Sequence, residues 1–336
     1  MPAETPRWKQ RLADNRDSRN WNLTSLALTL PLLLIGYYYY GGAALRTAAI
    51  SVLAAVATEF VAGRLILRRG TLSDWNAVVV GLWIACMLPA GAALHAAAGS
   101  IFAILVVKIP FGGTTHVPFS PAAAGFAFLT VSFPHRVFAY VPSEIAPPLH
   151  GRSLALLLQQ GRNVVDSTQI SGILLGQTLG PMGTGGILVI IAALLAMFLL
   201  KNRRSYALSS LGFIASVAVL AFLFPRVTGA EGFSARLAAA GMELFSGSLL
   251  FAAVFLLPEP ALMPGRWFTR LGVGAIAGVI AILLRNLGGG FEENVAFAIL
   301  LSNAMLPLLY RIQSEFYQQK EFREIIQAEE TEAPHA

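Results

Sequence analysis

The stretch Lys108–Pro121, which reads KIPFGGTTHVPFSP, joins two apolar segments of the chain. It contains prolines, a pair of adjacent glycines, a lysine and a histidine. At bilayer depth, such backbone and side chains are costly unless they are buried in protein or line a polar site. The stretch therefore predicts a functional loop within a membrane protein.

The composition of the whole chain favours a polytopic helical membrane protein. Of the 336 residues, 56% are hydrophobic and 12% are charged, whereas a soluble domain carries roughly 25% charged residues. The net charge of +6 does not indicate nucleic-acid binding, because the basic residues gather at the ends of apolar segments, as orientation in a lipid bilayer requires. The single cysteine, Cys86, excludes a disulfide framework and an all-cysteine metal site. We predict no catalytic residue and no metal ligands.

We predict ten membrane spans, near residues 24–40, 44–63, 75–92, 95–108, 120–134, 182–200, 205–225, 238–257, 267–285 and 295–311. With the N-terminus inside, most of the 24 Lys and Arg residues fall in inside segments, which predicts that both termini are cytoplasmic. The chain then divides into a cytoplasmic tail (1–22), a first membrane repeat (23–134), an external loop (135–181), a second membrane repeat (182–312) and an acidic cytoplasmic tail (313–336).

Two local patterns recur in the same order in the two halves. Asn76–Pro89 and Phe245–Pro258 both end in Leu-Pro, and the glycine pair after Phe111 is matched by glycines after Leu287. An odd number of spans in each half would place the halves in opposite orientations. We therefore expect two inverted five-helix repeats, with broken helices that meet near the membrane midplane. The alternative is that Gly and Pro breaks recur by chance in a chain rich in Ala, Leu and Gly.

From about residue 20 to 312, the chain resembles the RnfD family of the Rnf electron-transport complex, which is related to the NqrB family of the sodium-pumping NADH:quinone oxidoreductase. The motifs that carry this resemblance stand in order along the chain: Asp74–Gly81, Leu88-Pro89, Lys108–Gly113, Pro118–Ala122, Ser132–Pro134, Gly180–Thr184, Pro258–Pro260 and Arg285–Asn303. The resemblance implies a membrane component of a bacterial inner-membrane complex that couples flavin-mediated electron transfer to Na⁺ or H⁺ transport. The implied partners are other membrane and soluble proteins, similar to the A, C, E and G components of Rnf.

The resemblance also implies a flavin cofactor, typically FMN linked through its phosphate to a threonine in the external loop. In this chain the matching stretch begins at Asp166, and the threonine position falls on Gly172. Glycine has no hydroxyl group, so no phosphoester can form there. Either the covalent flavin is absent, or Thr168 or Ser171 carries it instead. We favour absence, so that any FMN or riboflavin is expected to be noncovalent.

Several residues of the opening stretch are candidates for holding that flavin. Lys108 could offset an anionic flavin or hold a helix C-terminus, or it could extend its ammonium group to the membrane interface. His116 could bond to a flavin ring or carry a proton near neutral pH, or it could satisfy the carbonyls of a broken helix. Gly112 and Gly113 are expected to provide positive φ or a close backbone approach.

Three carboxylates in or beside the predicted spans, Glu59, Glu243 and Glu259, are candidates for an ion pathway. A carboxylate within the membrane is a functional hypothesis by default, and the alternative is pairing with an arginine or with backbone groups. Glu292 and Glu293 are expected to be solvated or to lie at a helix N-terminus.

The sequence has no strand–glycine-rich-loop–helix fingerprint for a nucleotide, so the chain is not expected to oxidise NADH or ferredoxin by itself. Two other functions stay open. One is a urea-transporter-like channel, since such channels share the inverted five-span repeat, and a fold does not determine a function. The other is a flavin-free structural subunit of a redox complex.

Overall fold

Helices form all the regular elements of the computed structural model, which describes residues 7–66, 72–143, 145, 151–162, 170–287, 292–311 and 313–314. Among these residues, the β contacts are confined to an isolated bridge between Ser153 and Leu179. The expected all-helical architecture is therefore confirmed for the described part of the chain.

The N-terminal half contains two long helices followed by shorter elements. They are α1 (Arg7–Tyr40), α2 (Gly42–Leu65), η1 (Leu72–Asp74), α3 (Asn76–Cys86), α4 (Ala93–Phe102), the π-helical turn η2 (Ala103–Lys108), η3 (Thr114–His116), α5 (Pro121–Ser132) and α6 (Pro134–Val137). Helix α1 begins at Arg7, so it includes most of the predicted N-terminal tail.

The C-terminal half begins with two short helices from the predicted external loop. These are α7 (Leu154–Gln159) and α8 (Ile170–Leu174). They are followed by α9 (Ile187–Leu199), α10 (Arg204–Leu223), α11 (Phe233–Phe245), α12 (Leu249–Phe251), the π-helical turn η4 (Ala252–Leu256), η5 (Pro260–Leu262), α13 (Trp267–Asn286) and α14 (Val295–Ala304).

Among the described residues, four helices are long and apolar enough to cross a membrane, namely Ser18–Tyr40 of α1, α2, α10 and α13. The bent pair of α11 and α12–η4 would be a fifth. The other apolar helices are shorter than the roughly 20 residues that a full crossing needs. For example, the third predicted span, 75–92, contains only the 11 residues of α3, because Pro89 cannot continue a helix.

The eighth predicted span, 238–257, is not one continuous helix. Helices α11 and α12–η4 meet at an angle of 69° across a short break. Within that break Gly247 has φ of +62°, a backbone conformation that glycine adopts far more readily than other residues. This break agrees with the broken helices that the recurring sequence patterns predict.

Close helix packing organises the C-terminal half around α10 and α13. A Cβ atom at Gly274 would collide with the carbonyl oxygen of Ser209, and one at Gly212 would collide with that of Leu271. Glycines at both faces thus let the two backbones touch, which is a common basis for helix packing in membranes. In the N-terminal half, α2 packs against α3 and α4.

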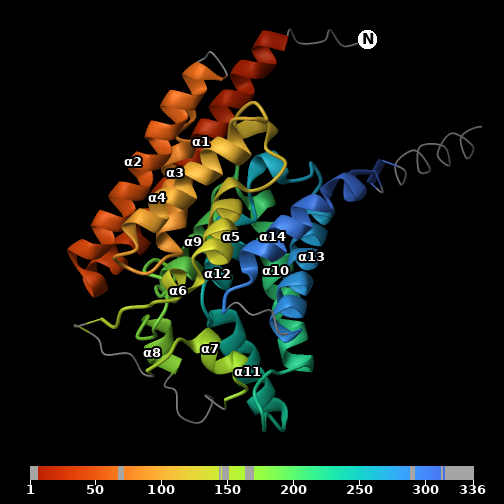
Figure 1. Ribbon diagram of the computed structural model, residues 1–336. Helices are drawn as coiled ribbons and strands as arrows, with labels where there is room; N and C mark the ends of the chain where they lie inside the picture. The colour runs from red at the N-terminus through yellow and green to blue at the C-terminus, as the bar shows by residue number, and fades with distance from the viewer. Residues whose placement is uncertain are drawn as a thin grey trace, which may run out of the picture.

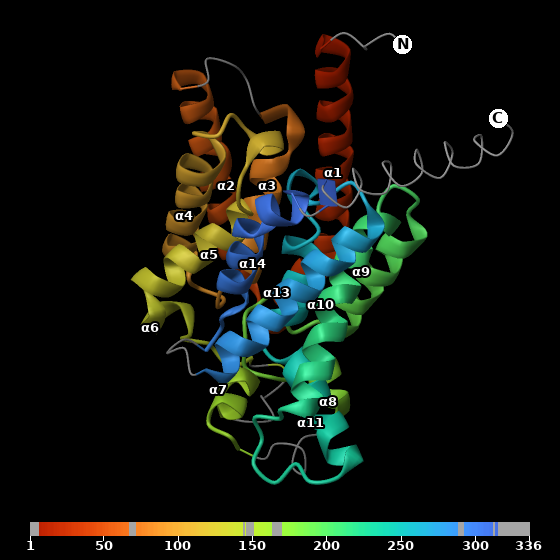
Figure 2. The same cartoon turned by 90° about the vertical axis from the view of Figure 1, so that its right-hand side faces the viewer.

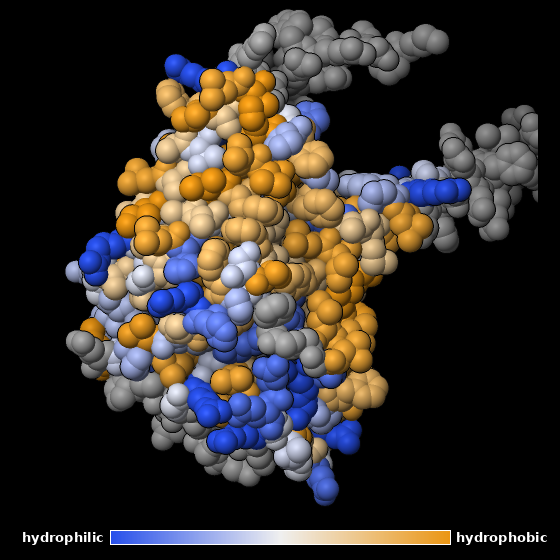
Figure 3. Space-filling model, viewed as in Figure 1, coloured by the Kyte–Doolittle hydropathy of each residue, from blue (hydrophilic) through white to orange (hydrophobic). Residues whose placement is uncertain are grey.

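The two halves meet along α5 and α14, which lie side by side in the centre of the molecule (Figures 1 and 2). The N-terminus of α1 is at one end of the molecule, and α7, α8 and α11 are at the opposite end (Figure 1). In Figure 3, hydrophobic side chains cover much of the surface toward the first end, whereas hydrophilic side chains gather at the second. We call these the N-terminal end and the α11 end.

Candidate functional site

A buried cation with two carboxylates lies at the N-terminal end, in what we call the Lys108 cluster (Glu59, Asp74, Lys108 and Thr114). The Nζ atom of Lys108, at the end of η2, donates a hydrogen bond to Glu59 Oε1 of α2 at 2.7 Å. It also lies 3.5 Å from Asp74 Oδ2 of η1. The Thr114 hydroxyl donates to the same Asp74 oxygen. The Lys108 and Glu59 side chains are both 0% exposed.

This geometry decides between the interpretations of Lys108 and Glu59. The prediction that the ammonium extends to the interface is wrong, because Lys108 is fully buried. Its ammonium contacts two carboxylates of the chain. For Glu59, the structure supports the pairing interpretation, and the cation is a lysine rather than an arginine. The cost of burying each charge is offset by its partner.

The loop after Lys108 turns through two glycines. Gly112 has φ of +96° and Gly113 has φ of +107°, which confirms the positive-φ interpretation. A Cβ atom at either position would meet nothing within 4 Å among the described residues, so these glycines do not serve contact with another helix of the chain. His116 lies on the surface of this loop, and its Nδ1 atom is 2.8 Å from the Thr115 hydroxyl.

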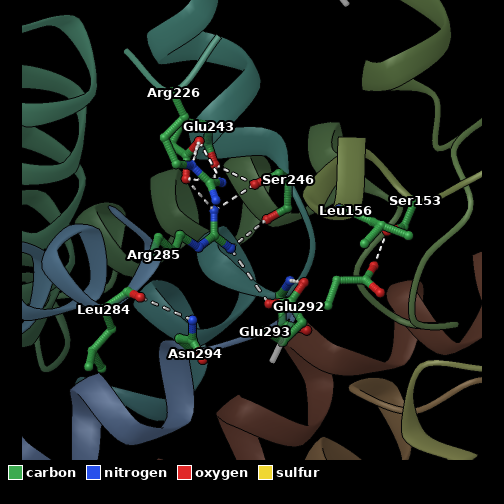
Figure 4. A network of polar contacts seen from close by, with 11 residues as sticks. Ser153, Leu156, Arg226, Glu243, Ser246, Leu284, Arg285, Glu292, Glu293 and Asn294 are labelled. Carbon is green, nitrogen blue, oxygen red and sulfur yellow. Dashed lines mark hydrogen bonds and ion pairs between the residues drawn. The ribbon is translucent and has the colours of Figure 1, made fainter. Parts of the chain in front are cut away.

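A second set of buried charges lies at the α11 end, in what we call the Arg285 cluster (Arg226, Glu243, Ser246, Arg285 and Glu293; Figure 4). Arg226 donates from Nε and Nη2 to the Glu243 carboxylate at 3.1 and 2.7 Å. Arg285 donates from Nη1 to Glu243 Oε1 at 2.8 Å and to the Ser246 hydroxyl at 2.6 Å. Its Nη2 atom lies 3.6 Å from Glu293 Oε2. Two guanidinium groups therefore balance two carboxylates, and Glu243 is held in ion pairs.

Glu293 also binds a helix N-terminus. The backbone N–H of Ser248, just before α12, donates to Glu293 Oε1 at 3.1 Å. The Glu293 side chain is fully buried, so the prediction that it is solvated is wrong, and the helix N-terminus interpretation holds for it. In the Lys108 cluster, the backbone N–H of Asn76 at the start of α3 donates to Asp74 Oδ1 at 3.0 Å. In both clusters a carboxylate next to a buried cation caps a short helix.

Glu292 links the same loop to the predicted external segment. Its Oε1 atom accepts a hydrogen bond from the Ser153 hydroxyl, at the start of α7 (Figure 4). Glu292 lies in the connection between α13 and α14, outside the membrane-spanning helices. Burial and the neighbouring Glu293 raise the pKa of Glu292 to about 8, against the opposing effect of Arg285.

A cleft of about 830 Å³ lies at the N-terminal end, next to the Lys108 cluster. Its lining comes from α1, the start of α3, η3, the turn between α9 and α10, and η5, and includes Trp21, Asn76, Thr114, Arg203 and Glu259. Glu259 is only 5% exposed. It lies in the connection between η4 and η5, where burial raises the pKa of its carboxyl to about 7 although Ser120 and Lys108 lower it.

The position matched to the flavin-bearing threonine does not fit a covalent flavin. Gly172 is buried in α8, where its carbonyl oxygen accepts a hydrogen bond from the backbone N–H of Gln177. It has no hydroxyl group to esterify. Ser171, one residue earlier, is exposed and does carry a hydroxyl. Asp166 and Thr168 lie outside the described residues. Gly172 therefore cannot carry a phosphoester-linked flavin.

Of the predicted site residues, the structure brings Glu59 and Lys108 into contact and places Gly112, Gly113 and His116 in the loop that follows. Glu243 lies at the opposite end of the molecule. Sequence reasoning missed the site roles of Asp74, Asn76 and Arg226, although Asp74 was part of a recognised motif. The available signal was the buried lysine itself, because a cation within an apolar span requires a nearby anion.

Comparison with known proteins places this geometry in context. Residues 9–318 match the model of the NQR2, RnfD, RnfE family. The chain is 29% identical to the D subunit of the ion-translocating oxidoreductase complex of Klebsiella pneumoniae, over 88% of this chain and 93% of that protein. It is 30% identical to the D subunit of the Na(+)-translocating ferredoxin:NAD(+) oxidoreductase complex of Acetobacterium woodii, over 85% of this chain and 86% of that protein. The protein, a multi-pass membrane protein, therefore belongs to the NQR2, RnfD, RnfE family.

Proposed function

We propose that the chain is the RnfD component of an Rnf-type complex, a membrane part of an oxidoreductase that couples electron transfer to Na⁺ or H⁺ transport. The observation that carries this proposal is the family match, which runs over residues 9–318 and leaves only short terminal segments outside it. Relatives named as this component cover nearly the same length. Other membrane and soluble components supply the electron donor and acceptor sites.

We also propose that the fold consists of two inverted five-helix repeats, residues 23–134 and 182–312, joined by the external loop 135–181. Two features support this arrangement. Lys108 and Arg285 each end the fourth span of a repeat, shortly before a glycine-rich stretch. Each cation contacts a carboxylate that caps a short helix, and the two clusters lie at opposite ends of the molecule. Both termini are then cytoplasmic, in a bacterial inner membrane.

The capped helices also bear on the alternative of a solute channel. In transporters with broken helices, the N-termini of the half-helices commonly bind anionic groups of the substrate. Here the chain's own carboxylates, Asp74 and Glu293, already accept hydrogen bonds from the amides at the starts of α3 and α12. These contacts argue against a channel that binds an anionic solute at these helix ends, and they do not bear on a channel for a neutral solute such as urea.

For the cofactor, we propose a noncovalent FMN or riboflavin rather than a phosphoester-linked one. Support comes from Gly172, which cannot be esterified, and from the family. His116, Gly112 and Gly113 remain the proposed contacts, because Thr114 and Thr115 of the same loop line the cleft. An absorption spectrum and an intact mass of the purified chain test this. Flavin absorbance with an unmodified mass is expected, and a mass increased by esterified FMN would contradict it.

Uptake of Na⁺ or H⁺ into vesicles tests the function. Vesicles with the complete complex should take up the cation only when an electron donor and acceptor are supplied. Vesicles that contain a complex without this chain should take up no cation, even when the donor and acceptor are supplied. Solute flux through the isolated chain without any reductant would instead support a channel, and full redox-driven uptake by the complex without this chain would contradict the proposal.

A further inference from the structure

Four cations gather at the first turn of α10, at the N-terminal end of the molecule. Lys201, Arg203 and Arg204 precede or begin this helix, and Arg270 of α13 donates a hydrogen bond to the Ser205 hydroxyl in its first turn. The turn contains no acidic residue, and among the described residues no carboxylate forms an ion pair with any of the four cations. Because a helix N-terminus adds a partial positive charge of its own, positive charge is unbalanced here.

Arg203 is the cation that orientation in a membrane does not explain. Exposed basic residues at a helix end are expected from orientation alone, but Arg203 is only 4% exposed. Its guanidinium donates to the Ser25 hydroxyl at 3.1 Å and to the Trp21 carbonyl oxygen, and its Cζ atom lies 3.8 Å from the centroid of the Trp21 ring. These partners are all neutral. Burial lowers the pKa of Arg203 to about 9, so it stays charged at neutral pH, and a buried charge is costly without an opposite one.

The start of α10 contrasts with the starts of α3 and α12. At those two helices a carboxylate of the chain, Asp74 or Glu293, accepts a hydrogen bond from a backbone N–H. At α10 the N-cap residue is Arg203, and no side chain caps the helix. Since helix N-termini bind phosphates and other anions readily, an anion from outside the described part of the chain would complete α10 in the same way.

The cleft at this end gives such an anion access, because Lys201, Arg203 and Trp21 all line it. Trp21 is 8% exposed, and its Nε1 atom has no hydrogen-bond partner among the described residues. Indole, ammonium and guanidinium groups only donate hydrogen bonds, so these three side chains suit the oxygen atoms of a phosphate. Glu259 lines the cleft too, but its carboxyl interacts with Lys108 and Ser120.

The lining of the cleft continues into an apolar surface. Leu200 lines the cleft and is 41% exposed, and Leu199, the last residue of α9, is 86% exposed. Leu195, one helical turn earlier, is exposed as well. Helix α9 packs beside the membrane-spanning α10 (Figure 2). A phosphate that carries acyl chains would cover these leucines, whereas a free phosphate would leave them bare. Basic pockets between membrane helices commonly bind the head groups of anionic lipids.

We propose that Lys201, Arg203 and the Trp21 indole N–H bind the phosphate of an anionic phospholipid, whose acyl chains lie along the exposed leucines of α9. Because Trp21 belongs to α1 and Arg203 to the turn before α10, the bound lipid would tie the two halves of the chain together at the N-terminal end. The inference goes beyond the proposed function and does not rest on it, since it requires only that α9 and α10 lie in a bilayer.

Lipid titration of the purified full-length chain in detergent tests this. Native mass spectrometry measures the affinities for phosphatidylglycerol and for phosphatidylcholine of the same chain length, and we expect the anionic lipid to bind more tightly. Lys201→Gln should weaken the binding of phosphatidylglycerol about fivefold, and Arg203→Gln about tenfold. Lys201 is exposed, so its variant gives a reading even if Arg203→Gln does not fold. Phosphatidylglycerol should also raise the unfolding midpoint of the wild type, because it binds the folded state.

Arg64→Gln is the matched control, because Arg64 is an exposed cation in the last turn of α2 and does not line the cleft. It removes the same charge and should leave the affinity for phosphatidylglycerol unchanged. An equal loss in Arg64→Gln and Lys201→Gln would show general attraction to surface charge and overturn the proposal, as would equal affinities of the wild type for the two lipids. Inorganic phosphate without lipid should not raise the unfolding midpoint, and a rise equal to that with phosphatidylglycerol would identify free phosphate as the ligand and overturn the lipid site.

Discussion

The Lys108 cluster and the Arg285 cluster are built from the same parts but are completed differently. Each has a buried cation at the end of a helix, and each has a carboxylate that caps a short helix. In the Arg285 cluster, two arginines contact Glu243 and one of them also lies near Glu293. In the Lys108 cluster, one ammonium is shared between Glu59 and Asp74, and Glu259 nearby has no ion pair among the described residues.

This difference teaches that similar parts can be closed by internal ion pairs at one end of a protein and can border a cleft at the other. Lys108 and Arg285 each contact two carboxylates, but arginine presents several donors in a fixed fork, whereas lysine is a compact point charge. The cluster with arginines is closed by internal hydrogen bonds. The cluster with lysine borders a cleft in which acceptors remain.

The largest effect is expected from Arg285→Met, which removes the cation shared by Glu243 and Glu293. Glu293 would lose its cation and Glu243 would keep only Arg226, which should lower the free energy of unfolding by about 3–5 kcal/mol. Chemical unfolding of the full chain in mixed micelles measures this. A loss smaller than about 1 kcal/mol would mean that the Arg285 cluster is not the closed structural unit described above.

Lys108→Met should destabilise the chain less, by about 2–3 kcal/mol, because the cleft lets an external cation or proton compensate part of the lost charge. The double variant Lys108→Met with Glu59→Gln should recover at least about 1 kcal/mol relative to the sum of the single variants. The same unfolding experiment gives both numbers. Strict additivity would show that Lys108 and Glu59 do not stabilise one another.

Glycine positions sharpen the comparison further. Gly247→Ala should cost about 2 kcal/mol, because φ is +62° and the new Cβ would collide with Glu293 Oε1. Gly112→Ala should cost only about 1 kcal/mol, because φ is +96° but nothing lies within 4 Å of the new Cβ. Thermal unfolding of the two variants side by side checks the order, and a reversed order would contradict the close contact of Glu293 with the break.

A dependence of stability on pH is expected at the α11 end. Glu292 has its pKa raised from 4.5 to about 8 in the folded protein, so the folded state binds more protons than the unfolded state between these values. Its contribution to stability is present below about pH 4.5 and is lost as pH rises toward 8. As pH rises from about 4.5 to 8, the unfolding midpoint of the wild type should therefore fall relative to that of Glu292→Gln. A difference that stays constant with pH would refute the raised pKa.

Some elements of this structure could be predicted from the sequence, and others could not. Gly112 and Gly113 were assigned positive φ from a glycine pair in a loop, and this was confirmed because it is a local property of the backbone. Broken helices were predicted, but the exact place of the break at Gly247 was not, because it depends on Glu293, which approaches from another part of the chain. Solvation of Glu293 was wrong for the same reason.

The sequence by itself determined that this is a multi-pass helical membrane protein of a recognisable family, because composition, segment length and ordered motifs are local or cumulative properties. Only the tertiary structure decided which charges are paired. The sequence separation is 49 residues between Lys108 and Glu59 and 42 residues between Glu243 and Arg285. A single sequence does not determine how two helices rotate against each other. Helix packing brought these charges together, and it also left Glu259 without an ion-pair partner among the described residues.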